Sequence, residues 1–150
     1  MLSNFIGSIK PNGCKGCAGL KVFISSHVLR SASGNLLSPI KRFIYIYNPK
    51  KHSISEIDNY VQLERLKAAL PTLEHETDQS AFIIFLVSDL AKMTFKYQER
   101  AYRFALLECG HIAQNLLLCA TSLKLKSFPV GAYMDDEVNF LLNLDGVTST

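Results

Sequence analysis

The sequence predicts one α+β domain, and three observations support this prediction. A chain of 150 residues with 48% hydrophobic residues can bury a core of ordinary size. Short runs rich in β-branched and aromatic residues, such as residues 43–47 (FIYIY), alternate with stretches that have helical spacing. One stretch, from about Gln98 to Leu123, has no proline and is apolar on nearly every face, which is typical of a buried helix. We therefore expect a β-sheet flanked by helices, with a long central helix that is buried in the core or against a second subunit.

Strands are expected at several places along the chain. Residues 22–24 form a short β-type run, and residues 42–47 form a second one that closes in the turn-like residues 48–51. The run over residues 81–87 (AFIIFLV) has no polar alternation, which suits a central strand covered by helices on both faces. Residues 126–133 are expected to form a strand and a loop.

Two further helices are expected. Ser55, with Asp58 three residues later, resembles an N-cap, and the apolar residues that follow keep a helical spacing that ends at Pro71. A last short helix would begin at Asp135 and Asp136, because acidic residues stabilise the first turn of a helix. Its apolar residues are Val138, Leu141 and Leu142.

Composition and charge exclude several classes of protein. The net charge is only +3 and the basic residues are scattered, so nucleic acid is not an expected partner. The N-terminus lacks the pattern of a signal peptide, and the longest apolar run is far shorter than the roughly 20 residues that a membrane span needs. Four cysteines are too few for a disulfide scaffold. We expect a cytoplasmic protein without a membrane partner, with a flexible leader over residues 1–20 and a single domain over residues 21–150.

No metal site is expected from the sequence. Cys14 and Cys17 have the C-x-x-C spacing of half a zinc site, but the chain has no second such pair. Glu108 and His111 share a helical face, and a buried, hydrogen-bonded histidine is favoured there over a metal ligand.

Three stretches together resemble one family. Residues 97–116 (YQERAYRFALLECGHIAQNL) resemble the long central helix of SagB-type dehydrogenases, and residues 127–138 (SFPVGAYMDDEV) resemble the S-x-P-[IV]-G-[GA]-[FY] loop that follows it. Residues 31–39 (SASGNLLSP) are similar to a third family loop, S-x-[AG]-[GN]-x-x-x-P. These enzymes belong to the nitroreductase-like flavoproteins and oxidise azolines to azoles in ribosomally made peptides.

The resemblance implies a nitroreductase-like fold with a mixed β-sheet, and a homodimer with FMN at the subunit interface. Glycine in the flavin loops lets the backbone come within hydrogen-bonding distance of the cofactor. The residues that the resemblance places around the flavin are Ser33, Gly34 and Asn35 in the first loop, and Pro129, Gly131 and Ala132 in the second.

Lys96 and Tyr97 match the Lys-Tyr pair that SagB-type dehydrogenases use at their active site. Azoline oxidation removes a proton from the ring while a hydride passes to the flavin N5, so a base or a polarising donor is needed opposite the cofactor. By resemblance, either residue would fill this catalytic role. A lysine can act as a base only where burial or a neighbouring cation lowers its pKa.

Two alternatives stay open. The family's N-terminal basic segment, which meets the flavin phosphate, has no counterpart in residues 1–30, and this favours a flavin-free relative that serves as a binding or scaffold subunit of a peptide-modifying complex. The other alternative is a general nitroreductase that uses NAD(P)H. Lys96 and Tyr97 argue against it, because such an enzyme needs no base for its substrate. The expected partners are a second copy of the chain, a peptide substrate and peptide-modifying proteins.

Overall fold

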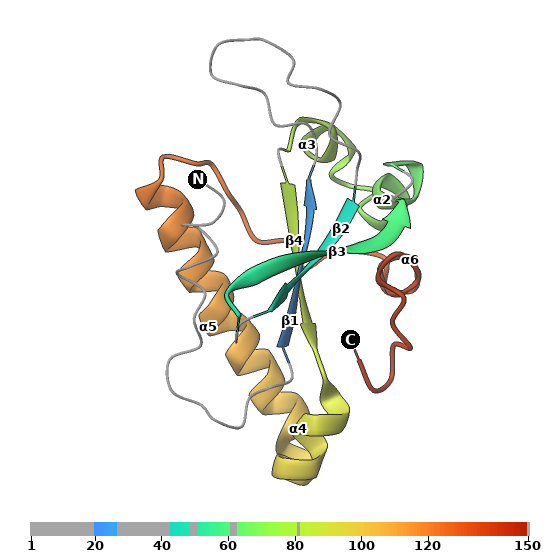
Figure 1. Cartoon of the computed structure of the whole chain (residues 1–150), viewed down its shortest axis with the longest axis vertical. Helices are drawn as coiled ribbons and strands as arrows, with labels where there is room; N and C mark the ends of the chain where they lie inside the picture. Colours follow the sequence, from blue (N-terminus) through green and yellow to red (C-terminus); the bar gives the residue numbers. More distant parts are fainter. Residues whose placement is uncertain (1–19, 27–42, 49–50, 61–62, 81, 150) are drawn as a thin grey trace.

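The computed structural model of the chain describes residues 20–26, 43–48, 51–60, 63–80 and 82–149 (Figure 1). Three of the sequence predictions fall outside these residues. They are the leader before Leu20, the cysteine pair Cys14 and Cys17, and the first flavin loop with Ser33, Gly34 and Asn35.

A four-stranded sheet lies at the centre of the described structure. Its strands are β1 (Leu20–Ser26), β2 (Phe43–Asn48), β3 (Ser53–Tyr60) and β4 (Phe82–Ser88), in the order β3-β2-β1-β4. All three pairings are antiparallel, so no parallel pair of the expected mixed sheet occurs among the described strands. Strands that run in the same direction are separated by a strand between them: β1 lies between β2 and β4, and β2 lies between β1 and β3.

The helix expected from Ser55 to Pro71 is wrong in its first half. Residues 53–60 pair with β2 as strand β3, and only α2 (Leu63–Ala69) is helical. The turn before β3 explains the difference: the Asn48 side chain accepts a hydrogen bond from the Lys51 N–H at 3.1 Å, and His52 adopts a positive φ of 51°. This turn brings the following residues beside β2, where hydrogen bonding to a neighbouring strand overrides a helical spacing.

Helices cover both faces of the sheet (Figure 1). On one face α2 and α6 (Asp135–Leu142) pack against Ile83, Phe85 and Val87 of β4, and on the other face α5 (Ala101–Ser122) packs against Phe82, Ile84 and Leu86. Alternate residues of a strand point to opposite faces, so β4 joins two cores. The predicted coverage of this strand by helices on both faces is confirmed. Its predicted central position is wrong within the described sheet, because β4 pairs there with β1 alone.

The remaining helices lie at the two ends of the sheet. α3 (Glu74–Gln79) follows α2, and α4 (Leu90–Tyr97) continues directly from β4. The short 3-10 turn η1 (Gln98–Arg100) then joins α4 to α5. The last helix begins at Asp135 as predicted, and its apolar residues Val138, Leu141 and Leu142 are buried.

The long helix α5 lies where the sequence predicts it, but it is not buried in this chain. Its buried residues are Ala101, Ala105, Leu116 and Ala120. Large apolar side chains on its other faces remain exposed: Tyr102 is 60% exposed, Leu106 56%, Leu107 52% and Leu118 59%. The sheet covers one side of the helix and leaves the opposite side uncovered, so burial within the core of this chain is wrong, and burial against a second subunit stays a prediction.

By length and composition alone, the helical stretch Leu90–Ser122 could also cross a membrane. It has 33 residues and a mean hydropathy of 1.2 in its most apolar window. Gln98 breaks this stretch, because its φ of 51° and ψ of −131° divide it into α4 and α5. Arg103 and Glu108 place charges within α5. The described stretch is therefore two helices that meet at an angle, with two charged residues in the second.

Candidate functional site

A cavity of about 820 Å³ lies along β4, between α5 and α6. We call it the β4 groove. Its lining is mostly apolar, and its size is in the range of sites that hold a cofactor or a substrate. Its walls are the residues of β4, the Tyr102, Leu106 and Cys109 side of α5, the loop residues 125–131 and 133, and Val138 and Asn139 of α6.

The connection from α5 to α6 forms one wall of the β4 groove. It has no strand, so the strand expected within residues 126–133 is wrong. Two backbone hydrogen bonds fix its ends: the Leu125 N–H donates to the Ala120 carbonyl at 2.9 Å, and the Met134 N–H donates to the Ala69 carbonyl at 2.9 Å. Because both ends are fixed, the loop follows the groove without needing to pair with the sheet.

The predicted flavin residues of this loop divide into two groups. Pro129 and Gly131 line the β4 groove, whereas Ala132 is exposed and lies outside the lining. A Cβ atom built on Gly131 would meet no atom within 4 Å, so no neighbour in the described chain excludes a Cβ there. The open space beside Gly131 is what the close approach of a flat ring to the backbone would need.

The described lining also fits the chemistry of a flavin. Ser88 Oγ is buried and has no hydrogen-bond partner within the described part of the chain, which leaves one polar group in the groove wall unsatisfied there. Lys126 is the cation among the described lining residues and is exposed, so it can meet a phosphate. The apolar walls suit a ring system, and these residues are therefore compatible with FMN.

Tyr133 and Cys109 are two polar side chains in the lining of the groove. Burial raises the pKa of Tyr133, and the charges of Asp135, Cys109 and Tyr102 raise it further. Burial, followed by the charge of Glu108, raises the pKa of Cys109. The phenol and the thiol consequently stay protonated near neutral pH. Cys109 therefore lacks the thiolate that a nucleophile needs, and Tyr133 remains a hydrogen-bond donor.

The predicted catalytic pair lies at the end of α4. Lys96 Nζ lies 4.8 Å from the centroid of the Tyr97 ring, and this ring lies 4.6 Å from the Phe104 ring with a tilt of 38°. The packing between Tyr97 and Phe104 fixes the half-buried tyrosine, and the Lys96 side chain rests over it as a cation–π pair. Lys96 itself is exposed and lines a separate hollow of about 530 Å³ with Ala91, Lys92 and Phe95.

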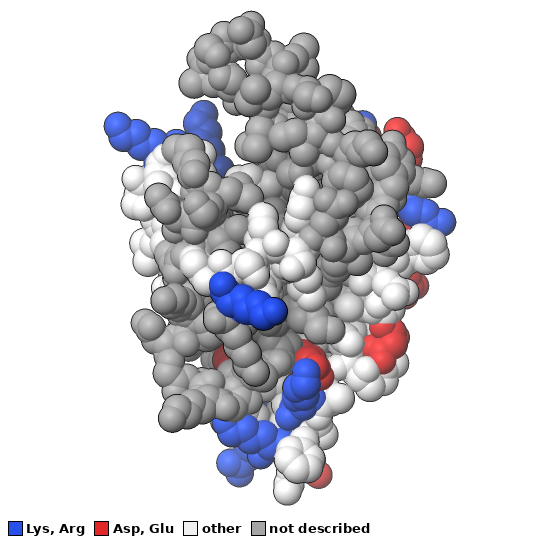
Figure 2. Space-filling model, in the orientation of Figure 1, with Lys and Arg blue, Asp and Glu red and all other residues white. Residues whose placement is uncertain are grey.

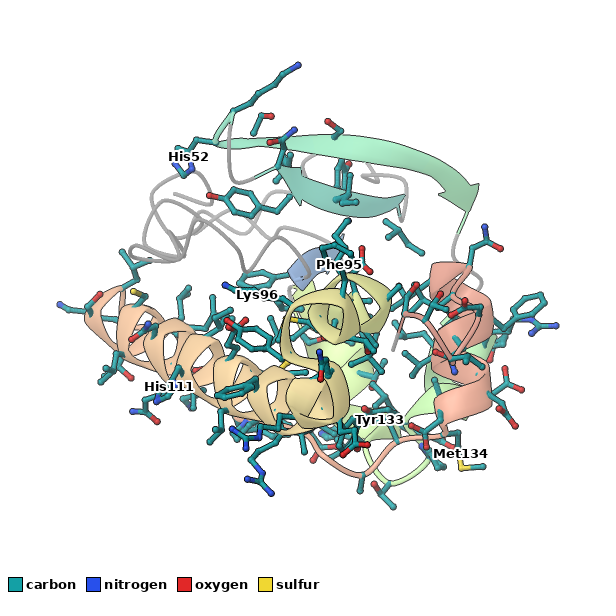
Figure 3. All side chains as sticks on the ribbon, turned by 90° about the horizontal axis from the view of Figure 1, so that it is seen from below. His52, Phe95, Lys96, His111, Tyr133 and Met134 are labelled. Atoms are coloured by element: carbon teal, nitrogen blue, oxygen red, sulfur yellow. The ribbon has the colours of Figure 1, made fainter. Side chains whose placement is uncertain are left out.

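Within one chain, the structure does not bring the catalytic pair to the flavin loop. Lys96 and Tyr97 are absent from the lining of the β4 groove, and Figure 3 shows Lys96 and Tyr133 on opposite sides of the junction between α4 and α5. A site that uses both groups of residues would therefore need a second surface to complete it.

His111 is exposed on α5, so the interpretation of this residue as a buried histidine is wrong. Its helical position points away from the core face that carries Ala105 and Leu116. Among the described residues, no group of three histidine, cysteine or acidic side chains could hold a metal ion.

The sequence analysis missed Ser88, Tyr102 and Tyr133 as residues of the site. Ser88 could have been noticed as the hydroxyl that ends an otherwise apolar strand. Tyr102, Leu106 and Cys109 follow the i, i+4, i+7 spacing of one helix face, which was visible but had no known partner. Only the folded chain shows that this face turns toward the loop before α6.

The chain belongs to the nitroreductase family, whose model matches residues 25–149. It is 33% identical over 106 residues to MJ1384 of Methanocaldococcus jannaschii, a protein provisionally named a nitroreductase, and this match covers 70% of the chain and 52% of MJ1384. It is 43% identical over 54 residues to the microcin B17-processing protein McbC of Escherichia coli, which covers 36% of the chain and 20% of McbC. The chain thus spans about half the length of the first relative and a smaller part of the second.

Solved structures show the same fold. A chain of the Escherichia coli microcin synthetase McbBCD complex, with truncated pro-MccB17 bound, matches with a TM-score of 0.73 at 21% identity over 99% of this chain and 58% of that chain. A crystal structure of a protein provisionally named a nitroreductase, from Anabaena variabilis, matches with a TM-score of 0.75 at 24% identity over 94% of this chain and 27% of that chain. The predicted nitroreductase-like α+β fold is confirmed.

Proposed function

We propose that this chain is an FMN-dependent oxidoreductase that oxidises azolines to azoles in a ribosomally made peptide. The observation that carries the proposal is the β4 groove, because the loop that resembles the family's flavin loop forms one of its walls. The name of McbC, a microcin-processing protein, supports a peptide substrate.

The residues of the groove would hold the flavin, which supplies an acceptor for a hydride when it is bound. Gly131 leaves its backbone open to the ring, and the apolar side chains of β4 and α5 exclude water around it. Lys126 would contribute a charge-assisted contact to the phosphate. The first loop, with Ser33, Gly34 and Asn35, is proposed as a further contact on the resemblance alone.

The proton of the azoline would be removed by Lys96 or Tyr97. Since this pair lies outside the β4 groove, we propose that a homodimer completes the site, with the catalytic pair and the groove coming from different copies. The exposed leucines Leu107 and Leu118 of α5 support a second copy on this helix. Contact with that copy would also remove water from around Lys96, which is what a lysine base requires.

Partner proteins and location are part of the same proposal. The solved McbBCD complex is an assembly of several proteins with a peptide bound, and this supports a peptide-modifying complex around the chain. We propose that the protein works in the cytoplasm, where ribosomal peptides are made.

The experiment that tests this proposal is the visible absorbance spectrum of the purified protein, recorded before and after FMN is added and the sample is desalted. Retained flavin bands are expected for the native protein. Gly131→Val should lose them and keep its fold by circular dichroism, because the position is exposed and the added Cβ meets no atom within 4 Å. The control is Ala68→Val, an exposed position on α2 outside the groove, which should bind flavin like the native protein.

A colourless protein that cannot be reconstituted with FMN would overturn the proposed flavin cofactor and would favour the alternative of a scaffold subunit.

The second candidate function is a general nitroreductase that uses NAD(P)H, and the longer match to MJ1384 favours it. Flavin-loaded protein separates the two enzymes: an azoline peptide should be oxidised and Lys96→Ala should abolish this, whereas a general nitroreductase would consume NAD(P)H with a nitroaromatic acceptor and tolerate Lys96→Ala.

A further inference from the structure

Gln98 joins α4 to α5 through a backbone conformation that residues with a side chain rarely adopt. Its φ is 51° and its ψ is −131°. These angles are close to those of the first central residue of a type II′ turn, a position at which glycine is strongly favoured. Asn143 after α6 has nearly the same φ, but its ψ of 50° gives the ordinary left-handed conformation that ends many helices. Gln98 therefore carries more backbone strain than Asn143.

The strained residue turns α4 against the first turns of α5 (Figure 1). Met93 is 2% exposed and shares a buried cluster with Ala101 and Ala105. In an unbroken helix, Met93 and Ala101 would lie about 12 Å apart along the axis, because each residue adds about 1.5 Å. The cluster therefore depends on the bend, and its burial offsets the strain at Gln98.

The same bend sets the position of Lys96 and Tyr97. The centroids of the Tyr97 and Phe104 rings are 4.6 Å apart, whereas the same seven-residue step in an unbroken helix spans about 10 Å. Lys96 Nζ lies 4.8 Å from the centroid of the Tyr97 ring, so its place depends on where this ring is held. Both side chains are therefore positioned through the backbone of Gln98, whose own side chain is exposed.

We propose that Gln98 is a positioning residue, whose strained backbone holds α4 against α5 and so places Lys96 and Tyr97 for the reaction. Backbone strain of this kind persists where the surrounding structure fixes it, and it gathers at functional sites. The inference rests on the proposed function for the chemical role of the pair. The bend itself depends neither on that function nor on a cofactor.

The first test compares glycine with alanine at position 98 by urea unfolding. Both substitutions remove the same exposed side chain, and only glycine relieves the strain. Gln98→Gly should therefore have a folding equilibrium constant about fivefold above that of Gln98→Ala. The matched control is Ala68, an exposed helical residue of α2, where Ala68→Gly should lower the constant about fivefold. Alanine being favoured over glycine at both positions would overturn the inference.

The second test follows the bend through the methyl groups of the three methionines. Met93 is buried between α4 and α5, whereas Met134 is 53% exposed. With methyl-labelled methionine, a soluble paramagnetic agent should broaden the Met134 signal and spare Met93 in the native protein and in Gln98→Gly. Gln98→Pro excludes a positive φ and should broaden Met93 as strongly as Met134 while the fold is kept by circular dichroism. A protected Met93 in Gln98→Pro would overturn the inference, and if this variant does not fold, the comparison of glycine with alanine decides.

The third readout is turnover of an azoline peptide by flavin-loaded protein. Gln98→Pro should keep its flavin bands and lose about a hundredfold in kcat with a smaller change in KM, because a small misplacement of a reacting group has an effect of this size. Gln98→Gly should be at least as active as Gln98→Ala, and Ala68→Gly should keep the native kcat. A native kcat in Gln98→Pro with Met93 exposed would refute the positioning role. If the native protein has no azoline activity but Met93 responds as predicted, the proposed function fails and the strained bend stands.

Discussion

Removing two leucines from the outer face of α5 should dissociate the proposed homodimer. Leu107 and Leu118 are eleven residues apart, about three helical turns, so they share one face of the helix. They are 52% and 59% exposed. Fully burying a leucine contributes about 2 kcal/mol, so covering the exposed half of each contributes about 1 kcal/mol. A two-fold interface uses both residues twice, which gives about 4 kcal/mol, or about a thousandfold in the dissociation constant.

The assay is sedimentation equilibrium of native protein and of the double variant Leu107→Ala/Leu118→Ala. The variant should be monomeric at concentrations where the native protein is a dimer, and its unfolding midpoint as a monomer should change little because the side chains are exposed. The matched control is Phe140→Ala/Val147→Ala, two side chains that are 64% and 74% exposed outside α5. A native protein that is monomeric at micromolar concentrations, or a control that dissociates equally, would refute the reasoning.

Three further variants test the core, the C-terminal segment and the hairpin. Leu66→Ala truncates a side chain of α2 that is 2% exposed and belongs to the core cluster with Val87 of β4. Urea unfolding should show a loss of about 2–5 kcal/mol in the free energy of unfolding. A loss below about 1 kcal/mol would contradict the assigned core. Hydrogen bonds from the Thr148 hydroxyl and from the N–H groups of residues 147–149 hold the pKa of Asp145 below its usual range. The stabilisation from Asp145 is therefore present above about pH 4 and is lost as pH falls through the lower pKa of the folded state. The thermal unfolding midpoints of the native protein and of Asp145→Asn should differ at pH 7 and converge in acid. Tyr47→Phe deletes the 2.9 Å hydrogen bond between the Tyr47 hydroxyl and His52 Nδ1, and it should lower the free energy of unfolding in urea by about 1 kcal/mol. An unchanged urea midpoint would show that this hydrogen bond does not stabilise the protein in solution.

The exposed α5 residues explain why the sequence left two ways of burying this helix open. A helix that is apolar on every face is expected to be covered on every side, but this pattern does not predict which part of the chain or which partner covers each face. One face meets the sheet through Leu116 and Ala120, another forms the wall of the β4 groove with Tyr102 and Leu106, and a third carries Leu107 and Leu118 outward. All three faces are apolar in the sequence, and only the fold shows what covers each of them.

The positions of the charged side chains also depend on the fold. Figure 2 shows lysine and arginine side chains scattered over the described surface among acidic ones, as expected from the mild net charge of +3. The position of each charge still depended on the fold. In the sequence, Arg65 could be a solvated charge on a helix. In the structure, its Cζ lies 3.8 Å from the centroid of the Phe140 ring, and its Nη1 lies 3.5 Å from Glu137 Oε2. Arg65 therefore links α2 to α6.

Local patterns were sufficient where a segment's own residues decide its structure. The apolar run of β4, the acidic start of α6 and the proline-free length of α5 all lie where the sequence predicts them, because period, capping and the absence of breakers act over a few neighbouring residues. The family was also predictable, since its motifs are contiguous strings.

Tertiary structure decided everything that depends on residues far apart in the chain. Residues 53–60 became a strand because a turn placed them beside β2, although their own spacing favoured a helix. Ser88, Tyr102 and Tyr133 line one groove because β4, α5 and the loop before α6 meet there, and Lys96 lies outside it although a family motif grouped it with the loop. The spacing of residues along the chain predicts local helices and strands. It does not predict which distant residues meet, because distances in space are set by how the elements pack.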